Sequence, residues 1–171
     1  MSVITGFPPI AAPTARLLIL GTMPSVASLQ KQHYYAHPHN AFWPIMGALF
    51  DFEPSLDYAL RQQMLINNHI AVWDVLQSCR RPGSLDADIE LASLMTNDYR
   101  WFFSQHPHIK HLFFNGKMAE KLYRQHVLPD IVTHYPDLSY HLLPSTSPAF
   151  ATLKLAQKLE AWKLINQLVV K

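Results

Sequence analysis

The chain has 171 residues, 49% hydrophobic and 15% charged, a composition suited to one globular domain with a sizeable core. It excludes a disordered tail, and no apolar run approaches the roughly twenty residues of a membrane-spanning helix. The net charge is only +2, so bulk charge gives no ground for a polyanion partner. The single cysteine, Cys79, excludes an internal disulfide, a four-cysteine zinc site and a four-thiolate iron–sulfur cluster.

The chain reads as one unit. Residues 1–21 lack a charged stretch followed by a long apolar one, so we expect no secretory signal and a cytoplasmic location. No repeat, low-complexity stretch or linker interrupts the sequence. Residues 1–171 are therefore expected to form a single domain, and we expect a monomer.

Four short apolar runs predict buried strands, with helical patterns between them. They are residues 16–21 (RLLILG), 70–75 (IAVWDV), 109–115 (IKHLFFN) and 140–144 (YHLLP). This alternation predicts the α/β class: a three-layer α/β/α sandwich with a four-stranded, mainly parallel central sheet. Such sheets bind ligands beyond the carboxyl ends of their strands.

Polar residues and a glycine predict where helices begin. Ser55 precedes an amphipathic run, Asn97 precedes DYRWFFSQ, and Gly116 opens KMAEKLYRQHV. For the last helix, Ser147 is the expected cap and Pro148 the expected first residue, ahead of apolar residues at three- and four-residue spacing.

Small polar loops follow three of the predicted strands. They contain Gly21, Thr22, Met23, Pro24 and Ser25 in the first, Asn115, Gly116 and Lys117 in the second, and Pro144, Ser145, Thr146 and Ser147 in the third. Any one of them alone is an ordinary turn. Together they predict a site at one rim of the sheet, where backbone amides and hydroxyls can bind a base or phosphate oxygens.

One segment gives the site a family resemblance. Residues 33–43 (HYYAHPHNAFW), taken with GTMPS before them and LPSTSPA at 143–149, resemble the uracil-DNA glycosylase superfamily. Within it, the sequence is most similar to the hypoxanthine-DNA (deoxyinosine) glycosylases, with the mismatch-specific uracil glycosylases as cousins. Residues 70–89 and 113–123 also resemble that subgroup, in the same order.

The resemblance implies a four-stranded parallel sheet between helices and a monofunctional glycosylase of base-excision repair. Such an enzyme flips a deaminated base out of double-stranded DNA and hydrolyses its N-glycosidic bond, without a redox cofactor or metal. Hypoxanthine is the expected base and uracil a second candidate. Hydrogen-bond donors aimed at the leaving base and a positioned water are the groups this reaction needs.

The resemblance makes Asn40 the catalytic asparagine. Its amide can donate to a base oxygen and its carbonyl can orient water, although a neutral amide is no strong general base. Asn40 also stands just before the amphipathic run that starts at Phe42, so helix capping is the alternative role. Both roles are compatible.

Further roles follow from the same resemblance. Tyr35 is expected to stack on the flipped base, the alternative being an ordinary half-buried tyrosine. Asn115 is expected to contact the base or position water, the alternative being a turn residue. The first loop and Phe42 complete the expected base-binding set. The third loop, with Lys117 and Lys154, is expected to contact DNA and could supply the wedge that fills the vacated stack.

Two positions depart from the uracil-specific relatives. Met23 stands where mismatch-specific uracil glycosylases have a water-activating asparagine, and Leu143 where many uracil-specific relatives have a histidine before Pro-Ser. The first departure favours the deoxyinosine subgroup, which also lacks that asparagine. The second means that electrophilic help from an imidazole is absent at position 143.

Other motifs have weaker claims. His33, His37 and His39 invite a metal interpretation, but they lie in an extended segment with no acidic ligand nearby, so no metal is expected. Asp74 interrupts an apolar strand and would need a partner if buried, which keeps it a candidate for activating water or stabilising the sugar cation. Asp86 and Asp88 are expected to be surface or capping residues.

Basic residues recur beyond the predicted loops. They are Lys117, Lys121 and Arg124 on one helical face, Lys154 and Lys158 at the last helix, and Arg80 and Arg81 in a loop. Phosphates could pass there, but such stripes are usually solvated faces.

Two functional hypotheses remain: a deoxyinosine glycosylase, or a noncatalytic binder of nucleotides or structured nucleic acid in which the changes at Met23 and Leu143 mark lost chemistry. A nucleoside hydrolase is disfavoured because its clustered aspartates are not found.

Overall fold

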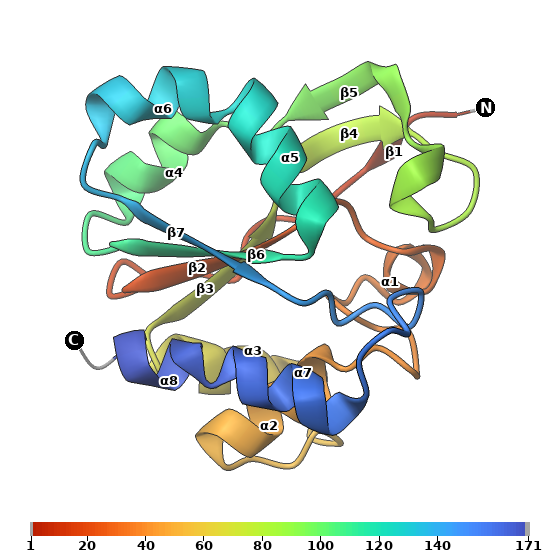
Figure 1. Cartoon of the computed structure of the whole chain (residues 1–171), viewed down its shortest axis with the longest axis vertical. Helices are drawn as coiled ribbons and strands as arrows, with labels where there is room; N and C mark the ends of the chain where they lie inside the picture. Colours follow the sequence, from red (N-terminus) through yellow and green to blue (C-terminus); the bar gives the residue numbers. More distant parts are fainter. Residues whose placement is uncertain (1, 170–171) are drawn as a thin grey trace.

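The computed structural model describes residues 2–169 and is built on a parallel sheet of four strands (Figure 1). The strands are β2 (Leu17–Gly21), β3 (Ile70–Asp74), β6 (His111–Asn115) and β7 (Ser139–Leu143), in the order β3-β2-β6-β7. Every residue of β2 and β3 is buried, as expected where helices cover both faces of a sheet. The four predicted strands and their parallel pairing are confirmed.

Helices form a layer on each side of this sheet (Figure 1). The layer on one side contains α4 (Tyr99–Gln105), α5 (Lys117–His126) and α6 (Leu128–His134). The layer on the other contains α2 (Phe42–Phe50), α3 (Tyr58–Asn67), α7 (Leu155–Trp162) and α8 (Leu164–Val169). A short α1 (Val26–Lys31) follows β2. The three-layer α/β/α prediction is therefore confirmed. Within residues 2–169, no helix has both the length and the apolar character needed to cross a bilayer.

A second, antiparallel sheet was not predicted. It consists of β1 (Ile4–Thr5), β4 (Leu76–Arg80) and β5 (Glu90–Thr96), in the order β1-β4-β5. Only Val75 separates β3 from β4, so no turn residue marks the change of sheet. The amides of Val75 and Leu76 donate to the carbonyls of Gly21 (2.9 Å) and Thr22 (3.2 Å). These bonds hold the chain against the first loop as it passes from one sheet to the other.

The predicted start of the last helix is wrong. The helix begins at Leu155 after Lys154, and Lys163 separates α7 from α8. Ser147 closes a short turn instead: its hydroxyl accepts from the Ala149 amide (3.2 Å) and its carbonyl from the Phe150 amide (3.0 Å). Residues 147–150 therefore form a turn and are not part of the helix.

Two other helix starts shift by one to two residues, and one is confirmed. The N-cap position of α3 is Asp57 rather than Ser55, and the Asp57 side chain makes no capping hydrogen bond. α4 is capped by Asp98, whose carboxylate accepts from the Trp101 amide (3.0 Å), while the side chain of Asn97 donates to the Asp74 carbonyl (2.8 Å). Gly116 precedes α5 as predicted.

Candidate functional site

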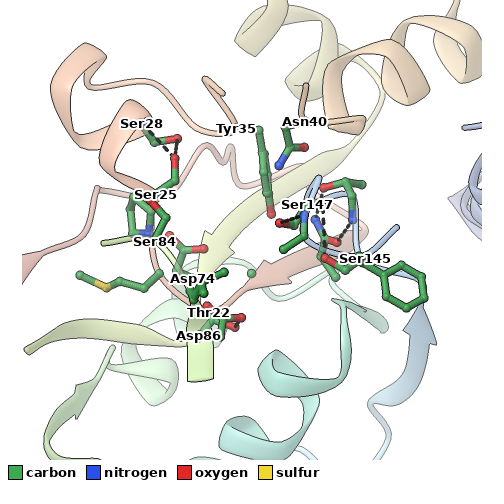
Figure 2. A pocket seen from close by; sticks show the side chains of 18 of the residues that line it. Thr22, Ser25, Ser28, Tyr35, Asn40, Asp74, Ser84, Asp86, Ser145 and Ser147 are labelled. Carbon is green, nitrogen blue, oxygen red and sulfur yellow. Dashed lines mark hydrogen bonds between the residues drawn. The ribbon is translucent and has the colours of Figure 1, made fainter. Parts of the chain in front are cut away.

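A cavity of about 360 Å³ opens at the carboxyl ends of the parallel strands. The first and third predicted loops and the strand end at Asn115 meet there, together with the segment before α2 and the segment around η1 (Asp86–Asp88). Of the predicted residues, those lining it are Gly21, Thr22, Met23, Pro24, Ser25, Tyr35, Asn40, Asn115, Ser145, Thr146 and Ser147. Figure 2 shows Tyr35 and Asn40 above, Asp74, Thr22 and Asp86 below, and the third loop to one side.

Gly21 leaves room for two side chains at the floor of the cavity. A Cβ at this position would lie 2.6 Å from Asp74 Oδ1 and 3.0 Å from the Tyr35 hydroxyl. Both groups therefore approach the end of β2 more closely than any residue with a side chain would permit. The hydroxyl of Tyr35 is buried and has no hydrogen-bond partner among residues 2–169.

Tyr35 is held as a rigid wall. Its ring stacks on Phe42, with centroids 4.0 Å apart and planes 25° from parallel, and its backbone has a positive φ of 55°. That backbone conformation is uncommon for a tyrosine and turns the ring toward the cavity. Phe42 itself is fully buried behind Tyr35 and does not line the cavity, which corrects the expectation that it contacts the base. It supports the ring that does face the cavity.

Asn40 lies just before α2 and lines the cavity. Its Oδ1 accepts a hydrogen bond from the amide of Phe42, the first residue of α2 (2.9 Å), but the N-cap is Ala41, so Asn40 supports the helix start without being its cap. Because a backbone N–H needs an acceptor, this bond also fixes which end of the amide is which. The Nδ2 group has no hydrogen-bond partner among residues 2–169, and the side chain lies at the cavity (Figure 2). The free group is thus a neutral hydrogen-bond donor.

Asn115 binds the third loop through both ends of its amide. Its Nδ2 donates to Thr146 Oγ1 and its Oδ1 accepts from the Thr146 amide, both at 2.9 Å. Both residues are buried. This reciprocal pair places the loop over the end of β6. In this geometry Asn115 acts as a positioning residue, although it also lines the cavity.

Three further hydrogen bonds fix the third loop. The Ala41 amide donates to the Thr146 carbonyl (2.9 Å), which ties the segment containing Asn40 to the loop. From α7, Trp162 Nε1 donates to the Pro144 carbonyl (2.9 Å) and Lys158 Nζ to the Ser147 carbonyl (3.3 Å). Lys158 is therefore buried and supports the loop. Its place in the sequence had suggested an exposed cation instead.

The floor of the cavity is acidic. Thr22 donates to Asp86 Oδ2 (3.0 Å), and Asp86 is only partly exposed, so the prediction of a surface or capping role for Asp86 is wrong. Burial and, second, the charge of Asp86 raise the pKa of Asp74 to about 7, while the guanidinium of Arg81 lowers it. Arg81 itself is buried and donates to the carbonyls of Gly83 (2.8 Å) and Pro24 (2.5 Å).

Several predicted residues lie outside the cavity lining, and several lining residues were missed. Pro144, Lys117 and Lys154 are not part of the lining; both lysines are exposed next to the rim loops. The missed lining residues are Ser28, Tyr34, Ser84, Leu85, Asp86, Ala87, Ala149 and Phe150. In the sequence, Asp74 could be found as a site residue because it is a charged residue at the end of an otherwise apolar strand. No comparable local signal marks Ser84 or Asp86, because a loop between β4 and β5 brings them to the site.

The histidine segment makes local contacts. His33 stacks on Tyr58, with ring centroids 3.9 Å apart, and His37 Nδ1 accepts from the His39 amide (3.1 Å). Among residues 2–169, no three histidine, cysteine or acidic side chains gather as a metal site would require.

Taken together, the cavity offers a flat aromatic wall, a free amide donor and a floor of two carboxyls. These groups suit a planar heterocycle with oxygen and N–H groups on its edge, stacked on Tyr35 and hydrogen-bonded from two sides. The small rim residues leave the opening accessible to a substrate larger than the cavity.

Comparison with known proteins agrees with this geometry. The profile of the uracil DNA glycosylase superfamily matches residues 8–168, and the chain belongs to that superfamily. Hypoxanthine DNA glycosylases of Methanosarcina barkeri and Methanosarcina acetivorans are each 34% identical to it over 115 residues, 67% of this chain and 72% of theirs. A solution NMR structure from M. acetivorans, described as a candidate uracil DNA glycosylase, superimposes with a TM-score of 0.77 at 27% identity. That match covers 96% of this chain and 99% of the other. The chain is thus a DNA glycosylase homologous to hypoxanthine DNA glycosylases.

Proposed function

We propose that this protein removes hypoxanthine from deoxyinosine in double-stranded DNA by hydrolysing the N-glycosidic bond. The observation that carries the proposal is Asn40, whose free Nδ2 faces a cavity walled by Tyr35. The relatives named as hypoxanthine DNA glycosylases support the choice of base. Uracil, which shares an adjacent C=O and N–H with hypoxanthine, is the second base to test.

The residues divide the work as follows. The flipped base stacks on Tyr35, and the Asn40 amide donates to the base as negative charge develops on it when the bond breaks. The second lone pair of Asn40 Oδ1 is available to a water at the sugar. Asn115 holds the third loop in place, and that loop with Lys117 and Lys154 contacts the phosphates on either side of the flipped nucleotide.

Excision from a labelled duplex containing one deoxyinosine, followed by alkaline cleavage of the abasic site, tests the proposal. The wild-type protein should give strand scission, and Asn40→Ala should slow it at least about a hundredfold, as loss of one transition-state donor does. Asn40→Ser keeps an oxygen for the Phe42 amide but no amide donor, so it should be equally slow while folding normally. Asn67→Ala, at an exposed asparagine of α3, is the matched control and should leave the rate unchanged.

Two results would overturn the proposal. One is undiminished scission by Asn40→Ser. The other is tight binding of the duplex with no scission by the wild-type protein, which would identify a noncatalytic binder.

A further inference from the structure

The carboxyl of Asp74 is a buried polar group of the cavity that the mechanism above does not use. The residue is 4% exposed, and its Oδ2 has no hydrogen-bond partner among residues 2–169. Its backbone carbonyl, in contrast, accepts from Asn97 Nδ2 (2.8 Å) and from the Tyr99 hydroxyl (2.6 Å). The backbone is therefore firmly held while the side chain has no partner. Buried polar groups in native proteins are normally paired, so a partner from outside the chain is expected.

The space around this carboxyl is shaped for such a partner. Asp74 lies at the carboxyl end of β3 and lines the cavity beside Gly21. Because Gly21 has no side chain, Asp74 Oδ1 and the Tyr35 hydroxyl both reach into the space beside its Cα, so these two polar atoms meet at one point of the cavity floor. A base stacked on the Tyr35 wall would thus present its edge toward the floor on which Asp74 stands (Figure 2).

The charges around Asp74 favour its neutral form. The titratable groups that interact with its charge are Asp86 of η1, Arg81 after β4, Tyr34 and Tyr35 before α2, Tyr58 of α3 and Tyr99 of α4. Arg81 is the only cation among them, and its guanidinium donates to the backbone carbonyls of Gly83 and Pro24. Burial, reinforced by Asp86, raises the pKa of Asp74 to about 7. The carboxyl thus keeps its proton well above the usual pH range of an aspartate.

Building on the proposed function, we infer that Asp74 reads the edge of the flipped base as a neutral carboxyl. Its hydroxyl donates to O6 of hypoxanthine, and its carbonyl oxygen accepts from N1–H. The adjacent N–H and C=O of a deaminated base match this donor and acceptor pair. An ionised carboxylate offers acceptors only and would face O6 with like charge. The donor at O6 also stabilises the electron pair that the base takes from the broken bond, whereas a carboxylate would oppose it.

This role predicts a pH dependence that one substitution removes. Between pH 6 and pH 8, the neutral fraction of a group with a pKa near 7 falls about tenfold, and the excision rate should fall with it. Asp74→Asn keeps a donor and an acceptor in the same shape but cannot ionise. Its rate should therefore be nearly constant over this range, and at pH 8 it should equal or exceed that of the wild-type protein.

Single-turnover excision of deoxyinosine from a duplex, measured from pH 6 to pH 8, tests the inference. Asp74→Leu should be at least a hundredfold slower at every pH. Asp88→Asn, at an exposed carboxylate of η1, is the matched control and should keep the wild-type profile. Asp86→Asn removes the neighbouring charge and should move the falling part of the profile to lower pH. The inference fails if folded Asp74→Asn is inactive, or if its rate falls with pH as that of the wild-type protein does.

A binding measurement separates this inference from the proposed function. Calorimetry with free hypoxanthine should show wild-type affinity about tenfold weaker at pH 8 than at pH 6, and no such change for Asp74→Asn. If the wild-type protein excises nothing but binds the base in this way, the proposed function fails and the role of Asp74 stands. If excision occurs but both proteins share one pH profile in rate and affinity, the role of Asp74 fails alone.

Discussion

At the scale of single residues, the cavity floor depends on Gly21, which has no side chain. Gly21 is buried like the rest of β2, but the side chains of Asp74 and Tyr35 occupy the space that its Cβ would fill. The requirement for glycine here comes from close approach of side chains and not from backbone conformation.

Gly21→Ala should therefore destabilise the protein by about 1–3 kcal/mol through overpacking, lowering Tm by roughly 3–10 °C. It should also slow excision, since the methyl group intrudes where the base edge is read. Gly6→Ala is the control: its nearest contact would be 3.4 Å, so stability should change little. Thermal unfolding of both variants checks the prediction, and equal Tm values would contradict it.

The stability of the protein should also depend on Asp74. Its pKa is about 7 in the folded state and near 3.8 when unfolded, so the folded state holds the proton more tightly. The free energy of unfolding should then fall as pH rises, by up to about 1.4 kcal/mol per pH unit between about pH 4 and pH 7, and level off above. The free energy of unfolding of the Asp74→Asn protein should not show this fall with pH.

Urea unfolding of the wild-type and Asp74→Asn proteins at pH 4.5, 6 and 8 measures the difference. The substituted protein should gain relative stability at each step upward in pH, with little further gain above pH 8. If the difference in unfolding free energy between the two proteins stays constant from pH 4.5 to pH 8, the buried carboxyl is ionised throughout.

At the scale of elements, the third loop is shaped by contacts from β6, α7 and the start of α2. The pair between Asn115 and Thr146 is the most buried of these contacts. A double-mutant cycle with Asn115→Ala and Thr146→Val should give a coupling of about 0.5–3 kcal/mol in unfolding free energy. Asn115→Ala should slow excision through the loop, mainly by raising KM. Additive effects would show that the two side chains do not act together.

The elements also show which features the sequence could predict. The four parallel strands were predictable because apolar runs buried on both faces stand out from their surroundings. The second sheet was not, since β1 has two residues and β4 follows β3 without a turn. The loops of the site were predicted from strand ends. The partner of Asn115, 31 residues away, and that of Thr22, 64 residues away, depend on packing that no local pattern encodes.

At the scale of the whole molecule, DNA must be held by local charge, since the net charge is only +2. Lys117 and Lys154 are exposed at the starts of α5 and α7, next to the rim loops. Replacing either by alanine should weaken duplex binding whatever the base and lower the slope of log K against log salt by about 0.9. Lys163→Ala, whose ammonium pairs with Glu160 (2.7 Å), is the control and should leave the slope unchanged. Filter binding over a range of salt concentrations decides between these outcomes.

The bond from the Ala41 amide to the Thr146 carbonyl has a consequence for turnover. It joins the asparagine segment to the loop, so the two walls of the cavity are already locked together before any nucleotide arrives. A cavity that is already ordered loses little conformational entropy when it binds a nucleotide. For the same reason, it gains little conformational entropy when the product is released. Abasic product should consequently leave slowly, giving a rapid first round of excision followed by a slower steady state.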